Sequence, residues 1–384
     1  MTVLAVLFSL LALVGAGQAV AARRALRRLA GSPLPTSPAL PASVLKPLHG
    51  AEPGLEEGLR ASFGQRHEAP FEVLMAVADP ADPARPVAEA AIAAGPAPGR
   101  LLAGGAVLGS NRKVSQLVHL EAAASHPILV AADADMLCPP EWLTAVSAPL
   151  ADPSVGLVTC LYRGEARRDT AWARLAALGI DWHFLPNAAL GEALGKAQGC
   201  YGATVALRQE TLERLGGFRD FLDLLADDHA LGAAVRRLGL RVVVSPVLPG
   251  HAMTETSLAE LWRHELRWAR TVRLLNPAGY AGLLFTHPLP WALLALALAP
   301  GALMAGVLGA ALGARLFLAT GVDRALGRRL CIRRLTTLPI RDLLSAAIWA
   351  TAWGTGRVDW QGRRYALSAK GRMTEAGSPR HRGS

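Results

Sequence analysis

The sequence predicts an α/β protein that is attached to a membrane by apolar helices. Two apolar runs of strand length, 71–78 and 128–132, each end at an aspartate and are followed by a helical pattern. Strands that alternate with helices in this way indicate a parallel sheet with crossover connections. Uncharged apolar runs at the N-terminus and beyond residue 276 have the length that a membrane span needs.

The composition argues against several classes of protein. The 384 residues are 52% hydrophobic and carry a formal net charge of +10, but the arginines lie beside apolar segments and no aromatic residues interleave them to stack on bases. Anionic lipid headgroups are therefore the expected counter-charge, and nucleic acid is not an expected partner. The cysteines are too far apart for a CxxC pair or a zinc site and are expected to be free thiols: Cys138, Cys160, Cys200 and Cys331.

The N-terminal run from Thr2 to Ala22 contains no charged residue and can cross a hydrocarbon core of about 30 Å. A group of arginines follows it directly: Arg23, Arg24, Arg27 and Arg28. A cleaved signal peptide is the alternative, but the run lacks a basic segment before it and its Ala-rich end is followed by arginines. We therefore expect an anchor over 1–28, with the following domain in the cytoplasm of a bacterial cell.

The next segments have the pattern of a linker and an α/β domain. The stretch 29–42 is rich in Pro and Ser, and 43–276 is the expected domain. Strands are expected to begin near 43–45 and to cover 71–78, 101–103, 128–132, 155–160, 201–207 and 241–245. Helices are expected at 52–63, 113–124, 167–178, 227–238 and 257–275.

The C-terminal part, 277–365, is expected to return to the membrane. Two spans joined by a tight turn fit the apolar run 280–299, which Pro288 and Pro290 interrupt, and a second run to Thr320. Arginines between 324 and 334 then mark a return to the cytoplasm. The apolar run 343–354 is short for a span and predicts an interfacial or re-entrant helix. The tail, 366–384, is polar and is expected to be disordered from Ser368.

Asp133 and Asp135 follow the apolar run 128–132 directly, at the expected carboxyl end of a buried strand. Ligands collect at this edge of an α/β sheet. Two carboxylates there suit Mg²⁺ or Mn²⁺, which prefer one or two protein carboxylates together with phosphate oxygens. The alternative is that one of them caps the turn before Pro139 and Pro140.

Other candidate residues occur in a fixed order along the chain. Asp79 ends the strand 71–78, and Asp227 and Asp228 begin a helix, where the helix dipole favours ionised carboxylates. The helix 257–275 carries HELRW at 264–268; it is too polar to span a bilayer and too aromatic to be only a solvated face.

In this order the sequence resembles a known family, the family 2-type inverting glycosyltransferases, and within it the ceramide glucosyltransferase-like branch that includes hopanoid-biosynthesis glycosyltransferases. The resemblance covers nearly the whole chain. It rests on SVLKPLHGAEPGLEEGL, FEVLMAVADPADPA, VGLV, GGF, ADDHALG, HELRW, PIRDLLSAAIWA and WQGRRY. Each motif is weak alone, whereas their order makes the set specific.

The resemblance implies a GT-A fold with a Rossmann-like mixed sheet, a UDP-sugar donor and a divalent cation. Asp79 matches the aspartate that holds the base or ribose of the nucleotide. Asp133 and Asp135 match the metal-binding pair. Asp227 and Lys113 are further candidate contacts to the nucleotide sugar.

The resemblance also implies the catalytic residues. Inverting transfer is one in-line displacement at the anomeric carbon, so a carboxylate must take the proton of the acceptor hydroxyl. Asp228 matches that general base. Arg267 would place a cation at the leaving group, and Trp268 would stack on the acceptor or the sugar. His264 stands where relatives usually have Gln or Arg, so it either donates a hydrogen bond or titrates near neutral pH.

Structural alternatives stay open for several of these residues. Asp79 precedes a proline and would also suit a turn, and Asp227, which replaces the Glu frequent in relatives, would suit a helix N-cap. His183 and His251 lie in plausible pocket segments, but lone histidines are more often structural. Cys200 could approach the donor or be a buried, inert thiol. Trp262 could pack against the domain or anchor at the bilayer surface.

The expected activity is transfer of an N-acetylglucosamine- or glucose-type sugar from a UDP-sugar to a lipid hydroxyl at the bacterial inner membrane. The preferred acceptor is a hopanoid, and ceramide is the alternative. A processive polysaccharide synthase usually has Gln at the position of His264 and more spans. A catalytically inactive membrane scaffold would not need the full set of acidic residues.

Overall fold

The computed structural model describes residues 2–196, 199–354, 357–360, 363–367 and 371–375. Contacts divide the chain into two units, each made of three separate segments. The helical unit comprises Met1–Gly31, Asp169–Lys196 and Glu255–Gly362, and the sheet unit comprises Ser32–Arg168, Ala197–Thr254 and Arg363–Ser384. The stretch 43–276 therefore contributes to both units.

The sheet unit is built on a seven-stranded mixed sheet, as the family resemblance implies. The fully parallel order that the alternation of strands and helices indicates is wrong, because the strand Thr204–Arg208 runs antiparallel to its neighbours. In spatial order its strands are β3 (Gly99–Ala103), β2 (Phe71–Val77), β1 (Ala42–Leu48), β4 (Ile128–Ala132), β8 (Thr204–Arg208), β6 (Val155–Cys160) and β9 (Arg241–Ser245). β1 to β4 are parallel, β8 is antiparallel to both of its neighbours, and β6 is parallel to β9. The carboxyl ends of β1, β2 and β4 therefore meet at one edge.

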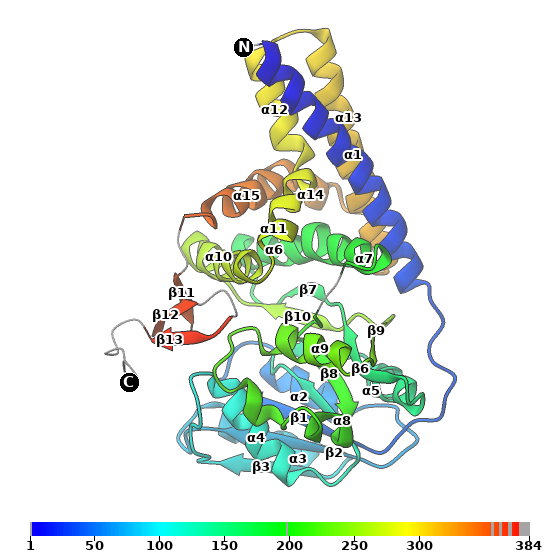
Figure 1. Ribbon diagram of the computed structural model, residues 1–384, viewed down its shortest axis with the longest axis vertical. Coiled ribbons are helices and arrows are strands. Elements are labelled where there is room, and N and C mark those ends of the chain that lie inside the picture. The colour runs from blue at the N-terminus through cyan, green and yellow to red at the C-terminus, as the bar shows by residue number, and fades with distance from the viewer. Residues whose placement is uncertain (1, 197–198, 355–356, 361–362, 368–370, 376–384) are drawn as a thin grey trace. The chain divides into compact units, whose positions relative to one another are not determined.

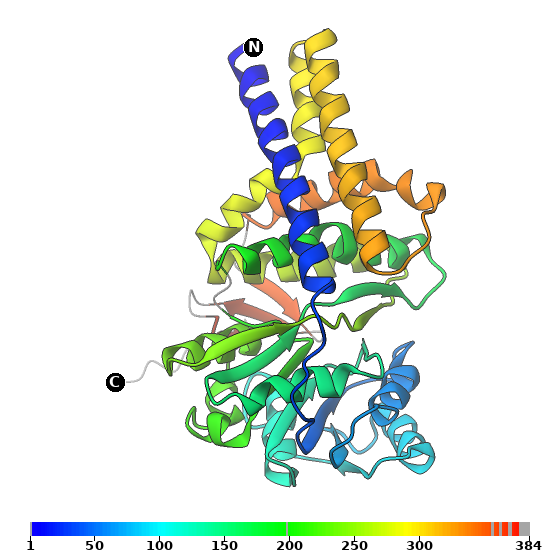
Figure 2. The ribbon, with the colours of Figure 1, turned by 90° about the vertical axis from the view of Figure 1, so that its right-hand side faces the viewer.

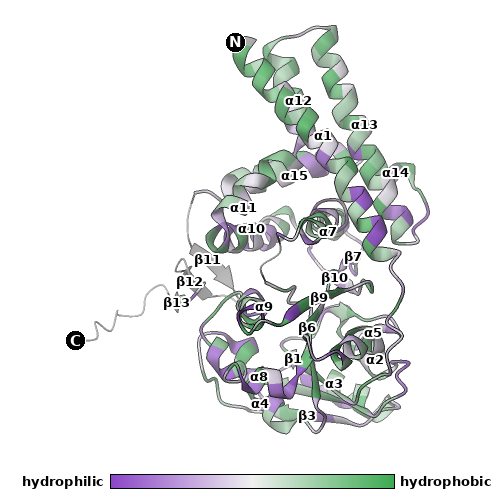
Figure 3. Ribbon diagram, turned by 45° about the vertical axis from the view of Figure 1, so that its right-hand side comes forward, coloured by the Kyte–Doolittle hydropathy of each residue, from purple (hydrophilic) through white to green (hydrophobic). Residues whose placement is uncertain are grey.

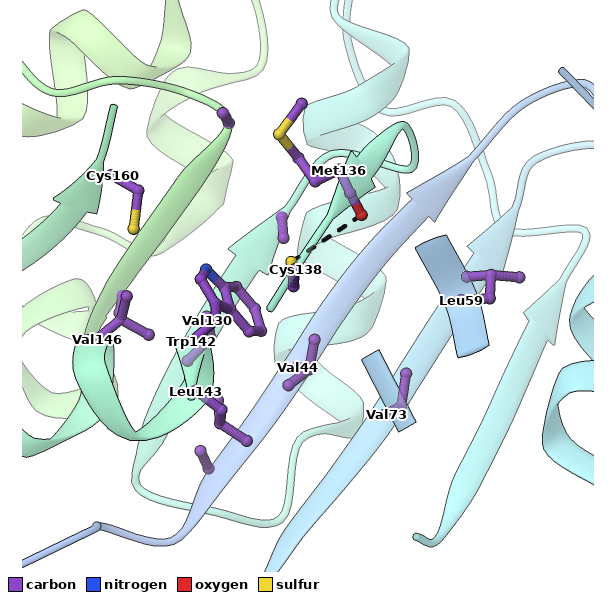
Figure 4. Packing of buried hydrophobic residues seen from close by; sticks show 14 of the residues in the cluster. Val44, Leu59, Val73, Val130, Met136, Cys138, Trp142, Leu143, Val146 and Cys160 are labelled. Carbon is purple, nitrogen blue, oxygen red and sulfur yellow. Dashed lines mark hydrogen bonds between the residues drawn. The ribbon is translucent and has the colours of Figure 1, made fainter. Parts of the chain in front are cut away.

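Alternate residues of the central strands enter two apolar layers, because successive strand side chains point to opposite faces. Val44 pairs with Val73 and Val130 across three strands, and this face packs against Trp142 (Figure 4). The Trp142 indole donates to Thr204 Oγ1 at 3.1 Å. Its covering helices are α2 (Leu55–Phe63), α3 (Ala84–Ala94) and α5 (Trp142–Ser147). The other face is covered by α4 (Arg112–Ala123), α8 (Gln209–Glu213), η3 (Phe218–Phe221) and α9 (Asp227–Arg237).

Two smaller groups of strands complete the sheet unit. β5 (Met136–Leu137) and β7 (Arg163–Ala166) flank β10 (Gly250–Met253), which is antiparallel to β5 and parallel to β7. β12 (Arg363–Leu367) pairs with β13 (Met373–Glu375) in an antiparallel hairpin. The prediction of disorder from Ser368 is thus wrong for 371–375, because backbone hydrogen bonds order this segment; 368–370 and 376–384 lie outside the described residues.

The helical unit contains three apolar helices that run beside one another (Figures 1 and 2). They are α1 (Thr2–Ala30), α12 (Pro288–Leu298) and α13 (Ala302–Ala325), and they are hydrophobic over most of their length (Figure 3). Small residues allow their close packing: Ala12, Ala292 and Ala311 are buried together. Val3–Ala30 and Ala302–Ala325 are long and apolar enough to cross a membrane.

The expected span 280–299 is broken in the structure. α11 (Pro277–Gly282) continues into η4 (Leu283–Thr286), and the chain then bends by 63° into α12. The bend falls at His287, whose φ of −117° and ψ of 55° lie outside the helical region, because a following proline disfavours that region. The pair is a broken span or a re-entrant loop, and it raises the possible number of spans among the described residues from two to three.

The remaining elements of the helical unit are α6 (Ala171–Gly179), η2 (Ile180–Phe184), α7 (Leu185–Ala193), α10 (Leu258–Leu275), α14 (Ile332–Leu335), α15 (Leu338–Thr351) and β11 (Arg357–Trp360). The helix expected from Arg167 begins only at Ala171, because Thr170 is its N-cap and accepts from Ala173 N. α15 lies where the sequence predicts a short helix, and its 14 residues correspond to about 21 Å of helix.

Candidate active site

Asp79 leaves β2 at the edge where β1 and β4 also end. Its side chain is exposed, and its Oδ1 accepts from Ala81 N at 2.8 Å, so it forms the turn that the residue type favours. The neighbouring Asp82 is buried and ties the end of β1 to the same turn, since its two oxygens contact Gly50 N at 2.8 Å and His49 Nδ1 at 3.0 Å. These contacts hold Asp79 at the edge but leave its role as a nucleotide ligand a prediction.

Asp133 and Asp135 lie on the tight connection between β4 and β5. The buried Lys46 of β1 donates its ammonium to the carbonyl oxygen of Asp133 at 2.9 Å, and Ala252 N of β10 donates to the carbonyl of Asp135 at 3.0 Å. Residues of two other strands therefore hold the backbone of both aspartates in place.

Lys113 connects the carboxylates of different elements. Its Nζ lies 2.6 Å from Asp133 Oδ1 and 4.0 Å from Asp227 Oδ2. Burial alone would lower the pKa of this ammonium, but the charges of Asp133 and Asp227 raise it well above its ordinary value. Lys113 is therefore a permanent cation at this edge. Its position follows from Asn111, which N-caps α4 by accepting from Val114 N.

Asp227 and Asp228 occupy the first turn of α9. The N-cap is Ala226, without a side-chain cap, so the expectation that Asp227 is the N-cap is wrong. Burial raises the pKa of Asp227 to about 6; Lys113 opposes this shift, whereas Asp228 and Asp133 add to it. Burial likewise raises the pKa of Asp228, against the influence of Lys113. The structure thus brings Asp133, Asp227 and Asp228 together around one ammonium.

A glycine-containing loop determines where the Asp228 carboxylate lies. Its Oδ1 accepts from His229 N at 2.7 Å, and a Cβ added at Gly202 would lie 2.7 Å from its Oδ2. Cys200 also packs here, with Sγ 3.0 Å from the carbonyl oxygen of Asp228. Burial raises the pKa of this thiol well above its ordinary value, so the inert, buried alternative describes it.

The donor set at Asp133 and Asp135 fits a divalent cation. Asp135 Oδ2 lies 3.0 Å from Nε2 of His251, a residue for which the sequence left a structural role open. Two carboxylates and an imidazole are ligands that Mn²⁺ accepts, and a diphosphate would supply further oxygens. Across the described ranges, however, no three His, Cys, Asp or Glu side chains already stand in a metal-binding arrangement. The site therefore needs substrate oxygens to be complete.

The HELRW residues lie on α10, in the helical unit. His264 Nδ1 is 2.7 Å from Glu255 Oε1, and its ring packs 4.2 Å from that of Trp268, measured between centroids. The guanidinium of Arg267 lies 6.0 Å from the Trp268 ring centroid. The hydrogen-bonding alternative for His264 thus has a partner, while a contact of Arg267 or Trp268 with the substrate stays a prediction.

His183 has a structural environment in the helical unit. Its Nε2 lies 2.9 Å from Asp342 Oδ1, and Asp342 also binds Arg315 at 2.7 Å. Burial and the nearby Arg315 charge lower the pKa of His183 to about 4, so the ring is neutral near pH 7. These contacts join η2 to α13 and α15 and agree with the packing role that the sequence left open.

Sequence reasoning did not identify several residues that shape the site. Lys46 interrupts an otherwise apolar strand, which was a usable signal because a buried lysine needs a partner. The cap residue Asn111 and the role of Gly202 depend on contacts between distant segments. No local pattern reveals such contacts.

The arrangement of the mixed sheet, with carboxylates at its edge, is that of a GT-A glycosyltransferase. The chain is similar in fold to the mannosyltransferase PcManGT from Pyrobaculum calidifontis, solved with GDP-Man and Mn²⁺: the two are 22% identical, the match covers 90% of this chain and 98% of that chain, and the TM-score is 0.51. A second match is glucosyl-3-phosphoglycerate synthase from Mycobacterium tuberculosis in complex with phosphoglyceric acid, with 20% identity, 61% and 79% coverage and a TM-score of 0.38.

The sequence model of glycosyl transferase family 21 matches residues 6–373. The chain belongs to this family and is a glycosyltransferase. The match confirms the resemblance to the ceramide glucosyltransferase type that the order of motifs indicates.

Proposed function

We propose that this glycosyltransferase moves a hexosyl group from a UDP-sugar to a hydroxyl of a membrane lipid, with inversion at the anomeric carbon. The observation that carries the proposal is the group of carboxylates around the Lys113 ammonium at the carboxyl edge of the sheet. A nucleoside diphosphate needs cationic partners, and an in-line displacement needs a carboxylate beside them. Both are present within one cluster.

Asp228 is the proposed general base. The acceptor oxygen attacks the anomeric carbon, the bond from that carbon to the diphosphate oxygen breaks, and the hydroxyl proton passes to the Asp228 carboxylate. Burial raises the pKa of this carboxyl, which makes it a stronger proton acceptor than an exposed aspartate. The His229 amide and the close approach of Gly202 hold it in one orientation.

Further residues are proposed to contact the donor. Lys113 would offset the charge of the diphosphate, with Asp227 beside it, and Asp79 would hold the base or ribose. Arg267 would add a cation at the leaving diphosphate, and Trp268 would stack on the sugar or the acceptor. His264, hydrogen-bonded to Glu255, would orient Trp268 through their ring contact.

Asp133 and Asp135 would hold a divalent cation, and His251 would be a further ligand once its contact with Asp135 is exchanged for the metal. When bound, the cation neutralises charge that develops on the leaving diphosphate. A bound Mn²⁺ in the similar mannosyltransferase supports this assignment. Lys113, whose Nζ lies 2.6 Å from Asp133 Oδ1, would supply a second cationic charge beside the metal.

A lipid acceptor is proposed because the chain carries apolar helices of membrane-spanning length. Among lipids we favour a hopanoid, a bacteriohopane polyol receiving an N-acetylglucosamine-type sugar, and ceramide receiving glucose is the alternative. The arginines in the last turns of α1 and those after α13 support placement of the sheet unit on the cytoplasmic side of a bacterial inner membrane.

The first test is a transfer assay on the detergent-purified full chain. UDP-glucose and UDP-N-acetylglucosamine are each offered with a bacteriohopane polyol or with ceramide, in the presence of Mg²⁺, Mn²⁺ or EDTA. Transfer to the polyol that EDTA abolishes is the expected result. Transfer only to ceramide would replace the acceptor, a polymeric product would indicate a polysaccharide synthase, and no turnover with any pair would contradict the proposal.

A second test distinguishes a catalytic role of Asp228 from a role in stability. Asp228→Asn should reduce the transfer rate by about 10² to 10⁴ while the melting temperature stays close to that of the parent protein. Asp152→Asn is the matched control, because Asp152 is a surface carboxylate paired with Arg241 at the start of β6 and β9. Full activity of Asp228→Asn would remove Asp228 from the mechanism.

A further inference from the structure

The segment that leads to the proposed catalytic carboxylates is held by the C-terminal end of the chain. Residues 222–226 connect η3 to α9 without helix or strand structure of their own, apart from an isolated bridge at Leu224. Leu225 N donates to Gly371 O at 3.0 Å, and Met373 N donates to Asp223 O at 2.8 Å. All of these residues belong to the sheet unit.

The same connection also joins the two elements that carry Lys113 and the carboxylates. Asn111 donates from its Nδ2 to Leu224 O at 2.7 Å and to Asp227 Oδ1 at 3.3 Å, and its backbone N donates to Leu222 O at 2.8 Å. Ser110 N donates to Asp223 Oδ1 at 3.0 Å. Any displacement of 222–226 would therefore alter the spacing between the start of α4 and the start of α9.

Burial and backbone conformation both support the C-terminal contact. Met373 is only 4% exposed, and Tyr365 of the paired strand β12 is 5% exposed, so both side chains are buried in the folded chain. Gly371 has φ +74°, a left-handed conformation that glycine adopts without steric cost. The turn into β13 thus depends on this glycine, and the hydrogen bonds that follow hold both neighbours of Leu224.

We propose that the C-terminal segment 371–373 is a positioning element of the active site, which fixes Asp227 and Asp228 relative to Lys113 through the 223–225 connection. The expected effect on turnover rests on the proposed function. Reacting groups that are misplaced by about 1 Å can lose about 10² in rate, so a loose connection should reduce turnover even when the protein stays folded.

The test uses the full chain with two variants that disturb the segment in different ways. Met373→Pro removes the N–H that donates to Asp223, and Gly371→Val places a β-branched residue at positive φ. Met373→Leu is the matched control because it keeps the amide and a buried apolar side chain of similar volume. Hydrogen exchange of peptides covering 222–228 and 71–77 is measured together with kcat and KM.

The expected result is faster exchange at 222–228 with unchanged exchange at 71–77 in both disturbed variants. kcat should fall by about tenfold or more, the donor KM should change by less than about threefold, and Met373→Leu should behave as the parent protein. Unchanged exchange at 222–228, unchanged kcat, or faster exchange in both peptides would overturn the inference. Lack of turnover by the parent protein would count against the proposed function, whereas the exchange measurement needs no substrate.

Discussion

Lys113 determines how the acidic residues of the site titrate. Its ammonium lowers the pKa values of Asp227 and Asp228, which burial raises above those of exposed aspartates. The base works in its ionised form, so activity should fall as the pH drops through this raised pKa. The acid limb of kcat/KM should therefore lie above the range of an ordinary aspartate, which is about pH 4.

Lys113→Met tests this coupling. Without the ammonium, the opposing influence on both carboxyls is lost and the pKa of each rises further. The acid limb of kcat/KM should move to higher pH, in addition to a lower maximal rate from the weaker diphosphate site. The pH profile of the purified variant measures both effects. A limb that stays in place or moves to lower pH would show that Lys113 does not act on the base.

Gly202 is a steric requirement of the same carboxylate. A methyl group there would lie 2.7 Å from Asp228 Oδ2, closer than atoms in contact tolerate, so Gly202→Ala should displace Asp228. We expect kcat to fall by about 10²-fold with little change in the donor KM. Gly191→Ala is the control, because a Cβ at Gly191 meets no atom within 4 Å. Equal activity of both variants would contradict the steric argument.

Among the elements, α15 links α10, the helix that carries the HELRW residues, to the apolar helix α13. Arg341 of α15 is buried and contacts both Glu265 oxygens, at 2.8 and 2.6 Å, and the adjacent Asp342 binds Arg315 of α13 at 2.7 Å. A buried ion pair contributes little compared with an apolar pair, but removal of one partner leaves an uncompensated charge that costs about 3–5 kcal/mol. α15 is therefore joined to α10 by the Arg341–Glu265 pair and to α13 by the Asp342–Arg315 pair. In each pair, loss of one partner would leave the other charge buried and unpaired.

This dependence predicts a non-additive pattern of stability. Glu265→Leu and Arg341→Leu should each lower the melting temperature in detergent, and the double variant should melt at a higher temperature than either single variant. Glu56→Leu is the comparison, since Glu56 pairs with Arg60 on the exposed face of α2 and such pairs contribute about 0.3–0.5 kcal/mol. Strictly additive losses in the double variant would contradict the coupling between the two buried charges.

At the scale of the whole molecule, the arginines around α14 predict which side of the membrane this segment faces. Cys331 is exposed and lies among them, whereas the remaining cysteines are buried: Cys138, Cys160 and Cys200. Burial raises the pKa of Cys138 to about 11, which further suppresses its reaction with thiol reagents. A membrane-impermeant maleimide should therefore report on Cys331.

We expect labelling in inside-out membrane vesicles and none in intact spheroplasts, because Lys- and Arg-rich segments stay on the cytoplasmic side. Cys331→Ser should abolish the signal, and labelling after solubilisation in denaturant confirms that the buried thiols are present. Labelling of intact spheroplasts would place the segment after α13 outside the cell and reverse the proposed orientation.

The sequence alone determined the parts of the fold that depend on local patterns. Apolar runs placed β2, β4, β6 and β9 within a residue or two, and Ser257 marked the start of α10 because its side chain caps the helix, accepting from Glu260 N. Long apolar runs predicted α1 and α13, since the hydropathy of a segment can be calculated without knowledge of its neighbours in space. The acidic residues at strand ends were equally visible.

Only the tertiary structure decided which of these residues meet and what else supports them. Lys113 and Asp227 are separated by more than a hundred residues in the chain, yet one lies within 4.0 Å of the other because α4 and α9 begin at the same edge. The return of 371–373 to the 223–225 connection likewise results from contacts between distant segments. Local propensity carries no information about such contacts, because their free energy comes from packing that exists only in the folded chain.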